Sequence, residues 1–187
     1  MDTTNHPLGH WAVIDLETSG IDPLNDSIID VGFLQFNGTE LVRSYSSLVQ
    51  TDVRISQFIK ELTGISQSMV NKAPSWNKVK LDVEDLEGHT LIAHNADFEK
   101  SFLDKTFKDL KDVDALPVYS DTIYWLGLIF PDFGRLGLET FIQKWNLRDS
   151  EVHRGLEDSI DLLKVVILTY QYMQDNPKDL HMLKSLF

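Results

Sequence analysis

Carboxylates recur at short spacing in three separate parts of the chain. Asp15 and Glu17 are one residue apart in an apolar run, residues 10–17 (HWAVIDLE), that has the length of a strand. Side chains two positions apart on a strand point to the same face, so these acids should converge where the strand ends. Two neighbouring anions repel, and a divalent cation such as Mg²⁺ or Mn²⁺ between them removes the conflict. The alternative is a pair of solvated acids at an exposed strand end.

The second group is residues 94–99 (HNADFE), directly after a short apolar run, residues 90–93 (TLIA). Asp97 and Glu99 are about 200° apart around a helix, so they cannot face the same site. Glu99 precedes Phe102 by one turn and is expected on the inward side, whereas Asp97 in the first turn interacts favourably with the helix dipole. The alternative for Glu99 is a border charge paired with a nearby lysine.

The third group is residues 153–158 (HRGLED). Five residues span about 500° of a helix, so His153 and Asp158 would not share a face if both were helical. Gly155 favours a histidine on the approach to a helix, with Asp158 projecting from the first turn. Taken alone, the pattern is more typical of an exposed loop histidine and an acid that stabilises a helix start.

Together the three groups supply four carboxylates and one histidine. Four carboxylates can hold two divalent ions about 3.5–4 Å apart, which stabilises both the attacking and the leaving oxygen when a phosphoryl group is displaced. A histidine beside them fits a general base that deprotonates the attacking water. The combination indicates metal-assisted phosphoryl chemistry.

The elements that must position these groups follow from the hydrophobic pattern. Three strand-like runs open the chain: residues 10–17, 28–36 and 40–48. Asn37-Gly38 between the second and third is typical of a tight hairpin turn. Two segments with helical spacing then end at Gly64 and Gly88, and the chain continues as strand, helix, strand, helix, helix. We expect one α/β domain whose mixed sheet, an antiparallel hairpin plus parallel strands, is flanked by helices.

The composition fits a single globular domain. Of 187 residues, 42% are apolar and 25% charged, and the absence of cysteine excludes disulfide scaffolds, zinc ribbons, iron–sulfur clusters and thiol nucleophiles. The longest apolar run, residues 123–130, is far shorter than the ~20 residues that a membrane-spanning helix needs. Residues 1–7 lack the features of a secretory signal, so we expect a cytoplasmic protein without a membrane partner.

The net charge of −12 bears on the class of ligand. It argues against a protein that holds long nucleic acid by its phosphates, because such proteins carry basic stripes. It does not argue against an enzyme whose carboxylates bind divalent metals, because the metals then supply the positive charge. For the surface as a whole, the favoured interpretation is an acidic surface that keeps the protein in solution.

In order and spacing, residues 14–20 (IDLETSG), 93–99 (AHNADFE) and 153–158 (HRGLED) resemble the three exonuclease motifs of the DEDD superfamily. The third motif has the H-x4-D form of the DEDDh branch, which is similar to the proofreading subunit of bacterial replicative polymerases and to ribonuclease T. Residues 62–65 (LTGI) also resemble that family. The resemblance covers residues 11–172 and implies a ribonuclease-H-like fold and two-metal hydrolysis of nucleotides from a 3′ end.

The resemblance assigns roles to individual residues. It implies that His153 is the general base and that four catalytic carboxylates bind the metals: Asp15, Glu17, Glu99 and Asp158. It implies substrate contacts by four further residues: Thr18, Leu62, His94 and Phe98. For Leu62 and Phe98, packing in the core is an equal alternative.

Two positions depart from the family pattern. Glu99 stands where the second motif usually ends in Asp, and the longer side chain predicts reduced activity or a shifted metal preference. Gly155 stands where Ala is common, which predicts a looser segment around His153.

We therefore expect residues 10–175 to form an exonuclease domain, between a flexible N-terminus (1–9) and a C-terminal helical tail (176–187). With two Mg²⁺ or Mn²⁺ ions, it would release nucleoside 5′-monophosphates from single-stranded or frayed 3′ ends of DNA or RNA, in DNA repair or RNA turnover. The alternative is a catalytically weakened docking or proofreading module of a polymerase or nuclease complex, a reading that rests on Glu99.

Overall fold

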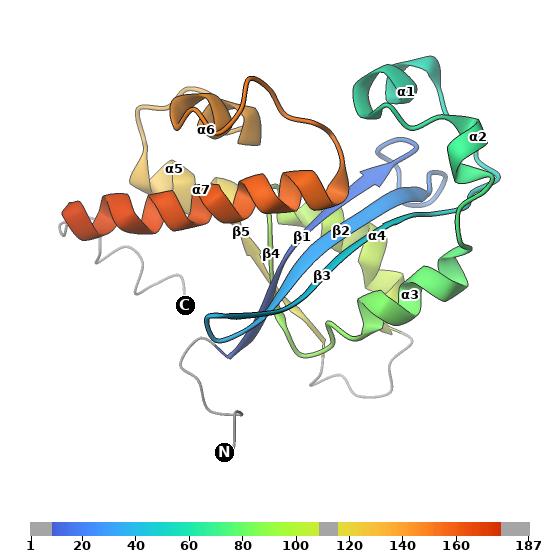
Figure 1. Cartoon of the computed structure of the whole chain (residues 1–187), viewed down its shortest axis with the longest axis horizontal. Coiled ribbons are helices and arrows are strands. Elements are labelled where there is room, and N and C mark those ends of the chain that lie inside the picture. The colour runs from blue at the N-terminus through green and yellow to red at the C-terminus, as the bar shows by residue number, and fades with distance from the viewer. Residues whose placement is uncertain (1–8, 109–115, 177–187) are drawn as a thin grey trace.

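A computed structural model describes residues 9–108 and 116–176 (Figure 1). Residues 1–8 and 177–187 lie outside the described part of the chain. They include nearly all of the N-terminal segment (1–9) and of the C-terminal tail (176–187) predicted above. The elements in chain order are β1 (His10–Thr18), β2 (Ile28–Asn37), β3 (Glu40–Leu48), α1 (Gln57–Thr63), α2 (Gln67–Val70), α3 (Trp76–Glu84), β4 (Thr90–Ala93), α4 (Ala96–Lys108), β5 (Val118–Asp121), α5 (Thr122–Ile129), α6 (Leu138–Lys144) and α7 (Gly155–Asp175).

The five strands form one mixed sheet in the order β3-β2-β1-β4-β5. The pairs β1–β2 and β2–β3 are antiparallel, whereas the pairs β1–β4 and β4–β5 are parallel. Gly38 turns the β2–β3 hairpin with a φ of 59°, a conformation that costs glycine little. The predicted mixed sheet with an antiparallel hairpin and parallel strands is confirmed.

Alternate side chains of β1 enter two cores on opposite faces of the sheet. Ala12 and Ile14 pack on the side of α3 and α4, whereas Val13 packs against α5, α6 and α7. Figure 1 shows α7 lying across this second face, with α5 and α6 beside it. Because side chains alternate along a strand, Asp15 and Glu17 share the face of Val13 and point to the α7 side.

The short helices α1 and α2 lie at the end of the sheet toward which β1 points (Figure 1). Ile55, Ile65 and Val70 pack there on Ile29 of β2 in a third, small core. α1 ends, as predicted, at Gly64, whose φ of 71° is left-handed.

Two helices, α2 and α5, were not expected from the sequence pattern. α2 is a single four-residue turn. α5 is apolar almost throughout, with Trp125, Leu126 and Ile129 buried, so it lacks the polar face whose period would mark a helix. Among the described residues, no helix combines the length and apolar character needed to cross a membrane.

Candidate active site

The acids of the first motif lie on β1 beyond the point where its neighbour β4 stops pairing. The β1–β4 ladder ends with Val13 opposite Ile92, so Asp15 and Glu17 border an open edge of the sheet. In α/β sheets, ligands bind outside the carboxyl ends of strands where the strand order changes direction. Both side chains are half-buried at this edge.

The first turn of α4 carries Glu99 beside this edge. The chain turns from β4 into α4 at Asn95, whose φ of 74° is left-handed and whose backbone N–H donates to Asp121 Oδ1 at 3.1 Å. Glu99 is only 2% exposed. Its Oε2 is buried and has no hydrogen-bond partner in the described part of the chain. A buried carboxylate oxygen without a hydrogen-bond partner fits a residue that binds a cation.

The start of α7 and the loop before it bring the third motif to β1. Glu17, His153 and Asp158 each place one ligand atom within 4.8 Å of the others. Asp158 is 1% exposed, and its oxygens accept the backbone N–H groups of Arg154 at 2.9 Å and Val152 at 3.3 Å. The side chain of His153 is 33% exposed. The loop therefore places an accessible imidazole beside two carboxylates.

Burial and mutual repulsion raise the pKa values of the acids. At Asp15 burial is the largest cause, followed by the charges of Glu99 and Glu17, and the pKa lies well above its usual value. Burial, followed by the charge of Asp158, raises the pKa of Glu17 to about 8. Burial also raises the pKa of Glu99 to about 8 and that of Asp158. Such a cluster is unfavourable when ionised unless a cation shares it, so these residues fit divalent metal ions.

His94, predicted to contact the substrate, is held by a hydrogen bond to α5. The Thr122 hydroxyl donates to the carbonyl of Ala93 at 3.1 Å, so in its 2.8 Å contact with His94 Nδ1 it accepts the ring N–H. Burial lowers the pKa of His94 to about 4 and keeps the ring neutral. The ring thus ties the end of β4 to the start of α5.

The three other predicted substrate contacts differ in exposure. Thr18 is 6% exposed, and its hydroxyl donates to the carbonyl of Gly20 in the turn after β1. Phe98 is half-buried, and its ring centroid lies 5.1 Å from that of Phe102 at the border of the core. Leu62 is 40% exposed on α1. Leu62 is therefore open to a ligand, whereas Thr18 and Phe98 also serve the protein's own structure.

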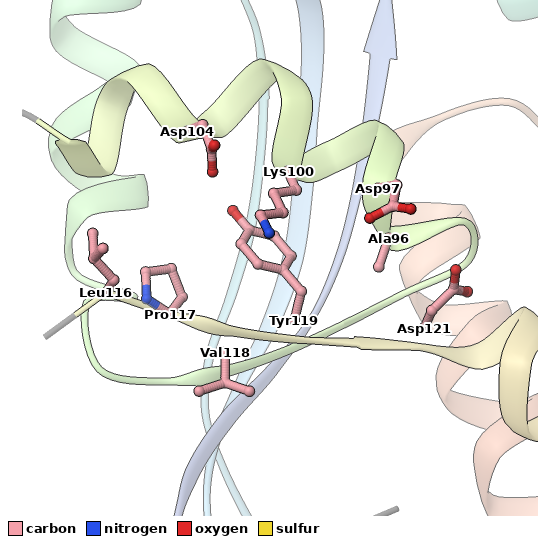
Figure 2. A pocket seen from close by; sticks show the side chains of 9 residues that line it. All are labelled: Ala96, Asp97, Lys100, Asp104, Leu116, Pro117, Val118, Tyr119 and Asp121. Atoms are coloured by element: carbon pink, nitrogen blue, oxygen red, sulfur yellow. The ribbon is translucent and has the colours of Figure 1, made fainter. Parts of the chain in front are cut away.

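A cavity of about 450 Å³ opens between α4 and β5. Figure 2 shows Tyr119 in the middle of it, with Asp97 and Asp121 together at one end. The Lys100 ammonium lies 6.0 Å from the centroid of the Tyr119 ring. Asp97 lines this cavity and Glu99 does not, so the turn of α4 separates the two acids as their spacing predicts.

Two acids that the sequence motifs did not indicate lie beside the cluster. Glu151 Oε1 is 3.9 Å from His153 Nδ1, and burial, followed by the charge of Asp158, raises its pKa to about 7. Asp30 is fully buried on β2, opposite Glu17 in the ladder. The signal for Asp30 was a charge inside an apolar strand. Glu151 stands in a polar loop, where nothing distinguishes it.

Gly155 packs directly on the sheet. A Cβ at this position would lie 2.5 Å from the backbone nitrogen of Gly32 and 2.9 Å from the carbonyl oxygen of Asp15. α7 therefore begins in close contact with the backbone of β1 and β2, and a side chain at Gly155 would force a shift in this packing. That Gly155 loosens the segment around His153 stays a prediction, although the missing side chain allows α7 to begin close to the sheet.

Comparison with known proteins decides the family. Residues 12–166 match the model of a family described as Exonuclease, RNase_T. The chain belongs to this exonuclease family. Over 178 residues it is 30% identical to the 3′–5′ exonuclease DinG of Staphylococcus aureus (strain USA300), a match that covers 95% of this chain and 20% of the relative. The chain thus spans about a fifth of the length of that relative.

Solved structures share the fold of this exonuclease domain. The nuclease domain of 3′hExo, a DEDDh family member bound to rAMP, aligns with a TM-score of 0.69 at 21% identity, covering 87% of this chain and 92% of that one. E. coli Exonuclease I in complex with a dT13 oligonucleotide aligns with a TM-score of 0.74 at 12% identity, covering 93% of this chain and 43% of that one. The predicted exonuclease family is confirmed by the family model, and the predicted fold by these structures.

Proposed function

We propose that residues 10–175 form a metal-dependent 3′–5′ exonuclease that releases nucleoside 5′-monophosphates from single-stranded or frayed 3′ ends of DNA or RNA. The observation that carries this proposal is the convergence of Glu17, His153 and Asp158 within 4.8 Å at the end of β1. The ligands of two structural relatives support it, since one is bound to rAMP and the other to a dT13 oligonucleotide.

The metal ligands we assign are four carboxylates: Asp15, Glu17, Glu99 and Asp158. Burial and neighbouring negative charges raise the pKa values of Asp15, Glu17 and Asp158, and these surroundings favour a shared cation. Glu99 adds a buried oxygen that has no hydrogen-bond partner among the described residues. Oxygen ligands of this kind suit Mg²⁺ and Mn²⁺. When bound, the two ions supply Lewis acidity and neutralise charge at the scissile phosphate.

His153 is the general base in this proposal. Its accessible ring lies beside Glu17 and Asp158, where a neutral imidazole can take a proton from a water molecule. The water oxygen then forms a bond to phosphorus, and the bond between phosphorus and the 3′ oxygen of the preceding nucleotide breaks. The 3′ oxygen takes up a proton from solvent, so the products are a nucleoside 5′-monophosphate and a strand with a new 3′ hydroxyl.

The terminal nucleotide would be held by Thr18, Leu62, His94 and Phe98. Leu62 offers an exposed apolar side chain, and Phe98 an aromatic ring that is only half-buried. Stacking on such side chains depends little on base identity. This agrees with an enzyme that grips the end of a strand with few basic residues.

The test is cleavage of 5′-labelled DNA and RNA single strands of matched sequence in the presence of Mg²⁺, Mn²⁺ or EDTA. Stepwise shortening from the 3′ end that needs a metal and is lost in Asp15→Asn supports the proposal. The ratio of DNA to RNA rates distinguishes DNA repair from RNA turnover. Cleavage that persists in EDTA, or in Asp15→Asn at more than a few per cent of the parental rate, refutes it.

Glu99 supports a second function, a catalytically weakened docking or proofreading module in a polymerase or nuclease complex. The family usually has Asp at this position, and Glu99 is buried too deeply to move freely. A folded protein that cleaves neither strand with either metal favours this module. Glu99→Asp would then restore turnover if the longer side chain is the cause.

A further inference from the structure

Asp30 is a buried carboxylate that the proposed chemistry does not use. It lies on β2 opposite Glu17, and none of its surface is exposed. A charge in such a place needs a partner. Arg154 supplies one, since its Nε donates to Asp30 Oδ2 at 2.7 Å, and the backbone N–H of Gly155 donates to the same oxygen at 3.4 Å. The pair joins residues 124 positions apart in the chain.

Arg154 follows His153 directly, so this ion pair anchors one side of the histidine. The backbone N–H groups of Val152 and Arg154 donate to the two oxygens of Asp158. These bonds tie the loop to the first turn of α7. The side chain of Arg154 ties the same loop to the sheet that carries Glu17.

His153 itself adopts a left-handed backbone conformation, with a φ of 55°. Residues with a side chain occupy this region rarely, and such a conformation persists only where the surroundings impose it. A return of φ to negative values would redirect the side chain. The imidazole would then leave the position within 4.8 Å of Glu17 and Asp158.

We propose that the Asp30–Arg154 ion pair positions His153, by fixing the backbone of residues 153–155 against β2. The inference rests on the proposed function, in which His153 is the general base. Asp30 and Arg154 are positioning residues here, since they act through the histidine and contact neither the water nor the phosphate. Their removal should slow proton transfer without changing which ligands bind.

The first test is a set of double-mutant cycles in the full chain. Asp30→Asn and Arg154→Gln should each lower kcat at least about tenfold and leave KM within about twofold, because the base is displaced while the rest of the site remains. Combining them should cost no more than the stronger single change. In a His153→Ala background, Asp30→Asn should have no further effect on kcat, because no imidazole remains to be positioned.

The Arg148–Asp161 pair provides a matched control for loss of stability. Arg148 Nε lies 2.7 Å from Asp161 Oδ2, with side chains 31% and 0% exposed, against 2.7 Å, 29% and 1% for Arg154 and Asp30. Asp161 also pairs with Lys164 at 2.8 Å, so Arg148→Gln should lower the melting temperature by no more than Arg154→Gln, while kcat stays near the parental value.

A second readout does not depend on turnover. The imidazole Hε1 resonance of His153, assigned in NMR spectra by its loss in His153→Ala, should shift and broaden in Asp30→Asn and stay unchanged in Arg148→Gln. An unchanged resonance in Asp30→Asn overturns the positioning role. The positioning role is also overturned if Asp30→Asn lowers kcat by the same factor in the parent and in the His153→Ala background. If His153→Ala keeps the parental kcat, the proposed base fails together with this inference.

Discussion

Raising the pH from about 5 to about 8 should destabilise the metal-free protein, because its clustered acids are held partly in the neutral form by the fold. The pKa of Glu17 rises from 4.5 to about 8 on folding, chiefly through burial. A raised pKa stabilises the fold fully below the unfolded value. That contribution is lost as the pH increases through the folded value.

The size of the effect follows from Glu17. Each pH unit between the unfolded and folded pKa values is worth about 1.4 kcal/mol, so a rise over about three units removes up to ~4 kcal/mol. Because Glu17 is partly exposed, solvent screening reduces this to about 2 kcal/mol. For a domain of this size, that corresponds to a fall in melting temperature of roughly 4–8 °C.

The assay is thermal unfolding in EDTA across this pH range, followed by titration with Mg²⁺ or Mn²⁺. Ligand at about a hundred times its Kd adds roughly 2.7 kcal/mol, and the gain should be larger near pH 8, where the acids are ionised. Glu17→Gln should flatten the pH dependence. Glu40→Gln, at an exposed position at the start of β3, should keep it.

Two results would refute this reasoning. One is a metal-free protein whose stability rises between about pH 5 and pH 8. The other is a Glu17→Gln variant with the parental pH dependence, which would show that repulsion among surface charges alone causes the slope. Stabilisation by metal that is equal in the parent and in Glu17→Gln would remove Glu17 from the ligand set.

Three further outcomes are expected. Asp158→Asn should abolish turnover while the circular dichroism spectrum stays parental, because the change removes a metal ligand without altering shape; turnover above a few per cent would contradict the assignment. His153→Ala should lower kcat by about 10²–10⁴-fold with little change in KM, the usual contribution of a general base, and a pure KM effect would argue against that role. Gly155→Ala should lower the free energy of unfolding by about 1–3 kcal/mol in denaturant titrations, because its Cβ meets backbone atoms of β1 and β2; Gly134→Ala, where a Cβ meets nothing within 4 Å, is the control and should be nearly neutral.

Local signals in the sequence predicted most elements of the sheet. The hairpin at Asn37-Gly38 and the helix end at Gly64 depend on backbone conformations that glycine adopts easily, so neighbouring residues suffice to indicate them. α5 was missed because nearly every one of its positions is apolar. A helix without a polar face has no period to detect.

The choice of Glu99 over Asp97 also followed from local geometry. Residues two apart on a helix face different directions, and the structure buries Glu99 beside Asp15 while Asp97 lines the cavity on the other side. That Glu99 binds metal remains a prediction. The closeness of Gly155 to the sheet was not foreseeable, because it depends on how α7 packs across β1 and β2.

By itself, the sequence determined which residue types are available for chemistry, their order along the chain and the family to which they belong. Spacing along one strand or one helix decides which side chains share a face, since those periods are local properties of the backbone. Only the tertiary structure decided that Glu151 lies beside His153 and that Asp30 pairs with Arg154. The Asp30–Arg154 contact joins residues 124 positions apart, and it forms because burying a charge in the packed core requires a partner that no local pattern specifies.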